Sequence, residues 1–296
     1  MSLIFKTAAL IGRYQTEGVA ESLQAIAAYL SERGLAVLLE SETAAAIGRQ
    51  DLAHAPAEAL GARADVAISV GGDGTMLGIA RQLASQGVPL VGINHGRMGF
   101  ITDIALDHWR EALGAVLDGS FRSENRTLLT ARVVRDDQTV WEELALNDVV
   151  VSRSSRAGMI ELQVEVDGAY MYNQRADGLV IATPTGSTAY ALSANGPILH
   201  PALQGIVMVP VAPQALSNRP IVLPDHCEVE LTVVGGRNPR VNCDMQSFAD
   251  LQTGDQVVLR RSADSSRFLH PPGYSYYATL RSKLNWHEMP SLNPAA

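Results

Sequence analysis

The consecutive residues Gly71-Gly72-Asp73-Gly74-Thr75 have the types and order of a site that handles phosphate. An apolar, β-branched run precedes them and a helix-like pattern follows, so we expect a strand, a tight turn and a helix. Glycines let the backbone approach a bulky anion, and the N–H groups and dipole at a helix start favour its negative charge. The turn therefore indicates phosphate binding.

Asp73 is the unexpected residue of this turn because a carboxylate repels phosphate. Either a bound metal ion offsets the repulsion, or the carboxylate removes a proton from an attacking hydroxyl. Both hypotheses indicate phosphoryl chemistry. An Asp73 that only caps the helix explains the acid but not the three glycines around it.

Strands and helices alternate over residues 1–122. We expect strands at 7–12, 36–39, 66–70 and 88–93, and helices at 19–33, 53–64, 75–84 and 109–116. This alternation predicts an α/β domain with a Rossmann-like, mostly parallel sheet, whose ligands bind at the carboxyl ends of its strands. Asn94 ends the strand after the glycine turn, and we expect it to reach a phosphate or ribose.

The hydrophobic period changes to two residues in the second half of the chain. Residues 160–167 alternate between apolar and polar, and Asp167-Gly168 is typical of a hairpin turn. We therefore predict an all-β, sandwich-like domain at 123–267.

Three polar features stand out in this β-rich half. Asn147-Asp148 interrupts an apolar strand, as a bulge or as buried groups that need partners. Residues 177–193 form a strand, a Thr/Ser/Gly loop and a short helix, with room for a flat base. Asp244 and Gln246, taken alone, predict a surface turn.

Composition limits the possible classes of protein. The chain has 296 residues, enough for two domains, with 47% hydrophobic and 18% charged residues, as in globular proteins. Its net charge of −8 argues against nucleic-acid and membrane-surface binding. The two cysteines form no disulfide framework or metal motif, and no signal peptide or membrane span is evident. We expect a cytoplasmic protein.

These motifs together resemble the NAD kinase family. The glycine turn, Asn147-Asp148, the 177–193 tract with the Asn195-Gly196-Pro197 that follows it, and Asp244-x-Gln246 match that family in order and spacing. The resemblance implies an α/β domain followed by a β domain, with residues 268–296 packing back on the first. It also implies transfer of a phosphoryl group from ATP to the 2′-hydroxyl of NAD, with a divalent cation (Mg²⁺ or Mn²⁺) as cofactor and a dimer or tetramer as assembly.

The same resemblance implies roles for individual residues. Asp73 is the expected general base. The expected phosphate contacts are Gly71, Gly72, Gly74, Thr75 and Asn94. The expected NAD contacts are Asp73, Gly74, Asn147, Asp148, Arg175, Asp177, Thr188, Ala189, Tyr190, Ala191, Leu192, Ser193 and Gln246.

Two positions depart from the family pattern. Gly158 stands where similar members often carry His or Arg, so Arg153 or Arg156 would have to supply that contact. Met245 stands where Gly is usual. Neither departure touches the expected base.

Two other functions fit the glycine turn. A lipid kinase of the diacylglycerol or sphingosine type uses the same turn, but the acidic charge and the match after residue 140 disfavour it. A non-catalytic NAD-binding sensor is disfavoured because Asp73 is present.

Overall fold

The computed structural model describes residues 4–12, 18–96, 99–154 and 158–286. The chain forms two compact units, one of Met1–Glu124 with Arg267–Ala296 and the other of Asn125–Ser266. The chain passes between them within strands β7 and β18. Of the helices in the described ranges, none is both long and apolar enough to cross a bilayer.

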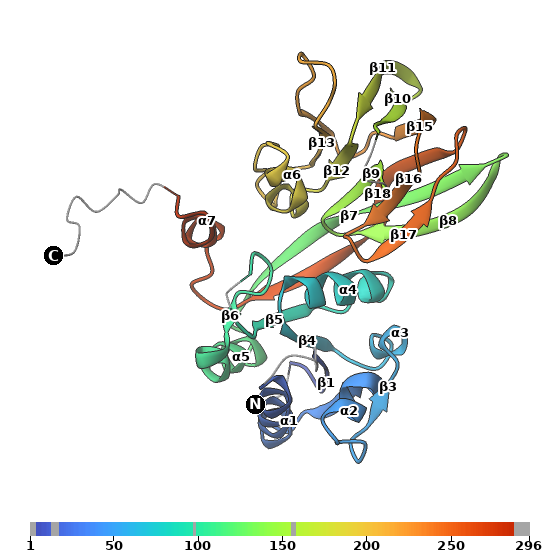
Figure 1. The fold of residues 1–296 in the computed structure, drawn as a ribbon. Helices are drawn as coiled ribbons and strands as arrows, with labels where there is room; N and C mark the ends of the chain where they lie inside the picture. Colours follow the sequence, from blue (N-terminus) through green and yellow to red (C-terminus); the bar gives the residue numbers. More distant parts are fainter. Residues whose placement is uncertain (1–3, 13–17, 97–98, 155–157, 287–296) are drawn as a thin grey trace, which may run out of the picture. The chain divides into compact units, whose positions relative to one another are not determined.

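The first unit is an α/β layer structure (Figure 1). Its parallel sheet has the strand order β3-β2-β1-β4-β5, and β5 also pairs in parallel with β6 and with the end of β18. The strands are β1 (Thr7–Gly12), β2 (Ala36–Glu40), β3 (His54–Ala55), β4 (Val66–Gly71), β5 (Leu90–Asn94) and β6 (Ile104–Ala105). Strand β18 spans Gln256–His270, and only its end, from Arg267, belongs to this unit. The helices are α1 (Val19–Glu32), α2 (Ser41–Ala46), α3 (Ala57–Leu60), α4 (Asp73–Leu83), α5 (Trp109–Leu117) and α7 (Tyr276–Leu284), with short 3₁₀ turns η1 (Ala84–Gln86) and η2 (Leu106–His108).

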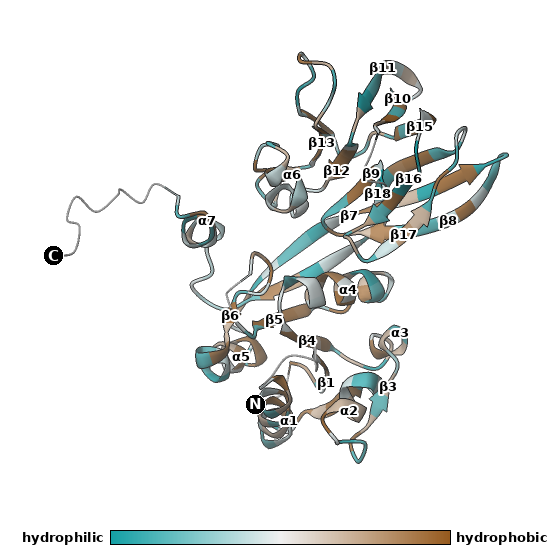
Figure 2. Ribbon diagram, in the orientation of Figure 1, coloured by the Kyte–Doolittle hydropathy of each residue, from teal (hydrophilic) through white to brown (hydrophobic). Residues whose placement is uncertain are grey.

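Helices cover both faces of this sheet. Val66, Ile68 and Val70 of β4 lie in one apolar cluster with the buried faces of α1 and α5. On the opposite face, Gly92 of β5 lies against Met76 of α4. A sheet covered on both faces requires apolar strands, and Figure 2 shows β4 and β5 mainly in brown. The predicted mostly parallel α/β architecture is confirmed.

One predicted helix of this unit is wrong. Residues 53–64 form the two-residue strand β3 and the four-residue helix α3 instead. Pro56 disfavours helical dihedrals at Ala55, and Ala55 pairs with Glu40 in the sheet. An alanine-rich composition alone did not reveal this break.

The second unit is all-β apart from one short helix. One antiparallel sheet has the order β14-β13-β12-β9-β16-β17, and the other strands are the ladder β11-β10-β15-β18 and the β7-β8 hairpin, with β7 paired to β18. The strands are β7 (Arg122–Arg135), β8 (Gln138–Ala145), β9 (Asp148–Arg153), β10 (Ile160–Val166), β11 (Ala169–Ala176), β12 (Gly178–Ala182), β13 (Gly205–Val211), β14 (Ile221–Pro224), β15 (Val229–Gly236), β16 (Pro239–Cys243), β17 (Ser247–Asp250) and the start of β18. A 3₁₀ turn, η3 (Gly186–Thr188), precedes helix α6 (Tyr190–Ser193).

The core of this unit lies between the two sets of strands. Val149 and Val151 of β9 join Leu162 of β10 and Leu231 of β15 in one cluster. Val150, between them in sequence, belongs to a second cluster that includes Ala191 of α6. Strand β9 is therefore buried on both faces, which fixes the position of the residues just before it. The predicted all-β second half is confirmed.

The strand that ends in the glycine turn should be sensitive to truncation. Ile68→Ala removes a fully buried side chain from β4, so we expect a loss of about 2–5 kcal/mol in the free energy of unfolding. The matched variant Ile4→Ala, at a position 56% exposed, should cost less than about 0.5 kcal/mol. Urea denaturation of both variants measures the difference, and equal losses would contradict the burial assigned to Ile68.

Candidate functional site

The glycine turn is built by the junction of β4 and α4. Gly71 ends β4, Gly72 is extended, and Asp73 is the first residue of α4. The space where Gly72 and Gly74 would carry a Cβ is open, with no heavy atom within 4 Å. Thr75 Oγ1 is buried and has no hydrogen-bond partner within the described ranges. A buried hydroxyl without a partner beside open backbone fits a turn that receives a ligand.

The Asp73 carboxylate is held by the loop at residues 99–102. Its Oδ1 accepts hydrogen bonds from Thr102 N at 3.1 Å, Thr102 Oγ1 at 2.8 Å and Ile101 N at 3.3 Å. Its Oδ2 accepts one from Phe100 N at 2.7 Å. A carboxylate offers about four acceptor positions, two on each oxygen. Oδ1 is thus saturated, and Oδ2 keeps capacity for another donor.

Close packing keeps this loop against Asp73. A Cβ added to Gly99 would lie 1.7 Å from Asp73 Oδ1, so only glycine fits there. Asn94, 2% exposed, donates from Nδ2 to Thr102 Oγ1 at 2.7 Å. Asn94, predicted to reach a phosphate or ribose, thus lies beneath the loop with its amide nitrogen bound to Thr102. Thr102 was not singled out from the sequence, because its partner Asp73 lies 29 residues away.

A polar corner of the other unit lies just before β9. It is formed by residues 146–148 and Asp244. Asp244 accepts hydrogen bonds from the backbone N–H groups of Leu146, Asn147 and Asp148, at 2.8–3.0 Å. Asp244 is buried, with φ of 53°. The expectation that Asp244 lies in a surface turn is therefore wrong, because its carboxylate satisfies three backbone donors at the break between β8 and β9.

The Thr/Ser/Gly tract packs against the same corner. Thr183 Oγ1 donates to the Leu146 carbonyl at 2.5 Å, and Thr183 N donates to the Asn147 carbonyl at 2.9 Å. A Cβ added to Gly186 would lie 1.9 Å from the Asn147 carbonyl oxygen. The corner and the tract, predicted separately, thus form one structure.

Asp148 is a strongly perturbed acid of this corner. Burial first, and then the nearby Asp244 carboxylate, raise the pKa of Asp148 from 3.8 to about 7, against a backbone hydrogen bond from Tyr190 that lowers it. A group with such a pKa exchanges its proton near neutral pH. Desolvated acids of this kind cluster at binding and catalytic sites.

The residues predicted around the acceptor differ in exposure. Tyr190 and Ser193 are exposed, whereas Ala191 is fully buried in the core cluster of β9 and β12. Thr188, Ala189 and Leu192 are half-buried. Gln246 is exposed beside Asp244.

Arg175 and Asp177 have separate partners. Arg175 lines a groove of about 570 Å³ together with Tyr172 and Gln214, and its Nε lies 3.9 Å from Glu161. Arg153 forms a bidentate ion pair with Asp177, with N–O distances of 2.8 and 3.0 Å. This hydrogen bonding lowers the pKa of Asp177.

The two departures from the family pattern lie between strands, Gly158 between β9 and β10 and Met245 between β16 and β17. Arg153, one candidate for the contact missing at Gly158, has its guanidinium on Asp177. Arg156, the other candidate, lies outside the described residues. Met245 has φ of 54°, a left-handed conformation that glycine adopts more readily. The usual glycine at that position thus has a conformational reason.

The sequence matches two family descriptions that together span most of the chain. Residues 9–121 match the ATP-NAD kinase N-terminal domain, and residues 146–270 match the ATP-NAD kinase C-terminal domain. A curated NAD kinase of Burkholderia pseudomallei is 59% identical over 288 residues, covering 97% of this chain and 96% of that protein. The chain belongs to the NAD kinase family.

Further members of the NAD kinase family agree with this assignment. An NAD kinase of Ralstonia nicotianae is 55% identical, with 97% of this chain and 95% of that protein covered. A solved NAD kinase from Archaeoglobus fulgidus, in complex with ATP, has a TM-score of 0.74 and 27% identity, covering 94% of this chain and 98% of that one. Yeast NADH kinase complexed with NADH has a TM-score of 0.89 over 97% of this chain and 89% of that one, and at 21% identity supports the fold alone.

The pKa of Asp148 has a consequence for stability. In the unfolded chain this acid ionises near pH 3.8, whereas in the folded protein it keeps its proton until about pH 7. The folded state is therefore progressively disfavoured as pH rises from about 4 to about 7, by up to roughly 4 kcal/mol at 1.36 kcal/mol per pKa unit. Asp148→Asn should abolish this decline, so the variant should be more stable than the wild type at pH 8 and similar at pH 4.

Denaturation of the ligand-free protein at both pH values measures the effect. Asp250→Asn is the control, because Asp250 is an exposed carboxylate in a surface ion pair with Arg240. An Asp148→Asn variant that is less stable than the wild type at pH 8 would contradict the desolvation of Asp148.

Proposed function

We propose that this protein transfers the γ-phosphoryl group of ATP to the 2′-hydroxyl of the adenosine ribose of NAD and so makes NADP. Membership of the NAD kinase family supports the reaction. The observation that carries the role of Asp73 is its hydrogen bonding: Oδ1 is saturated by the loop, whereas Oδ2 has one donor and room for another.

Asp73 acts as general base in this proposal. A ribose hydroxyl is too weak an acid to be ionised at neutral pH, so its proton must leave as the new P–O bond forms. The proton passes to Oδ2 of Asp73, the hydroxyl oxygen attacks the γ-phosphorus, and ADP leaves with the electron pair of the broken bond. The loop donors hold the carboxylate in place and leave Oδ2 with capacity for the proton.

The glycine turn binds phosphate. Gly71, Gly72, Gly74 and Thr75 stand at the start of α4, where the helix dipole favours negative charge. The open space at Gly72 and Gly74 and the unpartnered Thr75 Oγ1 support a phosphate there. Asn94 contributes through the loop that it holds, and a direct contact between its oxygen and phosphate stays a prediction.

A divalent cation, Mg²⁺ or Mn²⁺, accompanies the triphosphate. Within the described residues, no group of three or more acidic, histidine or cysteine side chains is arranged to hold a metal. This fits Mg²⁺, which commonly binds through substrate phosphates, water and at most one or two carboxylates. When bound, the cation neutralises charge on the transferring phosphate, while the protein residues position the two substrates.

The β-rich unit supplies the acceptor contacts. Asn147 and Asp148 offer an amide and an acid for ribose hydroxyls, and the backbone around them is fixed by Asp244. The proposed NAD contacts in this unit are Asn147, Asp148, Arg175, Asp177, Thr188, Ala189, Tyr190, Ala191, Leu192, Ser193 and Gln246. Ala191 is fully buried, and its contact with NAD stays a prediction. We also propose a cytoplasmic homo-oligomer, a dimer or tetramer, from the family resemblance.

Asp73→Asn tests the base directly. The amide keeps the size of the side chain but cannot take the proton, so we expect kcat for NADP formation to fall roughly 10²–10⁴-fold while NAD still binds. NADP is measured with ATP, Mg²⁺ and NAD, and NAD binding by calorimetry. Asp118→Asn, at an exposed position, is the control and should keep full activity.

Full activity in Asp73→Asn would refute the assignment of the base. A wild-type protein that phosphorylates lipid vesicles but not NAD would favour the lipid kinase. A wild-type protein that binds NAD without turnover would favour the sensor.

A further inference from the structure

A buried imidazole lies close to the loop that holds Asp73. His270 is the last residue of β18 and is 1% exposed. Its ring stacks on Tyr274, with centroids 3.8 Å apart and planes 6° apart. Phe268, two residues earlier, pairs with Leu90 of β5, so the sheet fixes the strand that carries His270.

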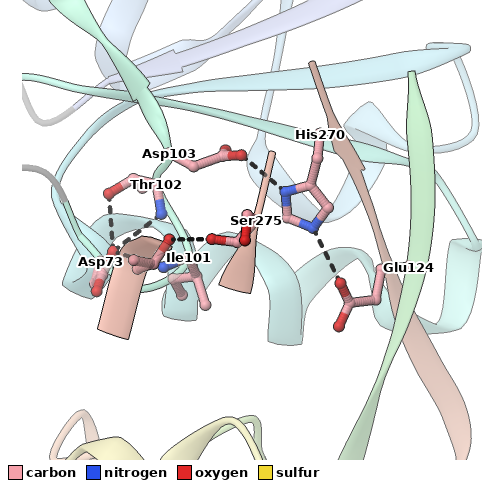
Figure 3. Close-up of polar contacts among 8 residues, drawn as sticks. Asp73, Ile101, Thr102, Asp103, Glu124, His270 and Ser275 are labelled. Atoms are coloured by element: carbon pink, nitrogen blue, oxygen red, sulfur yellow. Dashed lines mark hydrogen bonds and ion pairs between the residues drawn. The ribbon is translucent and has the colours of Figure 1, made fainter. Parts of the chain in front are cut away.

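Two carboxylates face the two nitrogens of this ring. Nδ1 lies 2.9 Å from Asp103 Oδ2, and Nε2 lies 3.5 Å from Glu124 Oε2 (Figure 3). Both acids are nearly buried, with side-chain exposures of 6% and 11%. A ring N–H can donate to one of these acids, and buried carboxylates are costly without a hydrogen-bond partner. The His270 ring therefore makes polar contacts with these acids in addition to its packing against Tyr274.

Asp103 connects this ring to the proposed base. It directly follows Thr102, whose backbone N–H and hydroxyl both donate to Asp73 Oδ1 (Figure 3). Asn94 of β5 donates a hydrogen bond to the Thr102 hydroxyl. His270 contacts Asp103, the residue after Thr102. The loop therefore has two anchors.

We propose that His270 is a positioning residue for proton removal by Asp73. By anchoring Asp103, it keeps Thr102 on Oδ1, and this leaves Oδ2 directed to the acceptor hydroxyl. His270 itself does not touch the substrate. The inference rests on the proposed role of Asp73 as base.

Three substitutions of His270 separate this role from packing. Phe keeps a ring that can stack on Tyr274 but has no nitrogen. Asn places an N–H donor near the position of Nδ1, toward Asp103, and Gln places one farther along, near the position of Nε2, toward Glu124. If His270 anchors Asp103, His270→Asn should be the active variant. If His270 acts only through packing, His270→Phe should be the active variant.

We expect His270→Phe and His270→Gln to lower kcat by roughly 10²-fold, the scale of a small misplacement at a reacting centre. His270→Asn should restore kcat to within about tenfold of wild type, by keeping the contact that orients the loop. The KM values for NAD and ATP should change little in all three, because no substrate contact is removed. Steady-state kinetics of NADP formation measure both parameters.

Matched controls exclude a general loss of stability. Arg135→Met breaks the ion pair with the buried Asp255 in the other unit, and should lower the melting temperature without lowering kcat. Asp103→Leu keeps about the volume of the side chain and removes the oxygen that the His270 ring contacts, so it gives a second test if His270→Phe fails to fold. We expect it to lower kcat with little change in KM.

The outcomes are distinct. Full kcat in His270→Phe or in Asp103→Leu overturns the inference, and so does a His270→Asn variant as impaired as His270→Phe. These results leave the proposed function intact, because the wild type still forms NADP. A wild type that forms no NADP rejects the proposed function and this inference with it.

Discussion

The hydrogen bonds between the Asp73 carboxylate and the loop at residues 99–102 are the interaction on which the proposed chemistry depends. They join the first residue of α4 to the loop that follows β5, and so link two neighbouring strand ends of the sheet. The contact is possible only because Gly99 lacks a Cβ. The loop donors saturate one oxygen of the acid and leave capacity on the other, which is what the proposed role of Asp73 as base requires.

Two acids that the proposed function uses, one in each unit, have different environments. Asp73 accepts hydrogen bonds from the loop at residues 99–102, whereas Asp148 is desolvated beside Asp244, so its pKa rises to about 7. Different surroundings can give chemically identical side chains different roles. In the proposed function, Asp73 takes the proton of the acceptor hydroxyl, and Asp148 binds a hydroxyl as donor or acceptor near neutral pH.

Local patterns in the sequence predicted the elements of the fold well. The apolar run before Gly71 and the period-2 alternation after residue 123 identified the strand before the turn and the β-rich half, because each pattern reflects burial within one element. The helix expected at 53–64 was wrong because one proline outweighed a run of helix-favouring alanines.

Contacts between segments distant in sequence were harder to predict. Asp244 binds backbone groups 96–98 residues earlier, and His270 lies 167 residues from Asp103, so no local pattern could pair them. The proposal that Asn147, Asp148 and Gln246 bind NAD came from the family resemblance. The spacing of these residues alone gave only buried polar groups that need partners.

A crystal structure of the protein with NAD and a non-hydrolysable ATP analogue tests the central claim most directly. Our account predicts that Asp73 Oδ2 lies about 2.6–3.2 Å from the 2′-hydroxyl oxygen of the adenosine ribose, the reach of a general base, with Thr102 still donating to Oδ1. A structure in which another group of the protein holds that hydroxyl, with Asp73 turned away from the ribose, would contradict it.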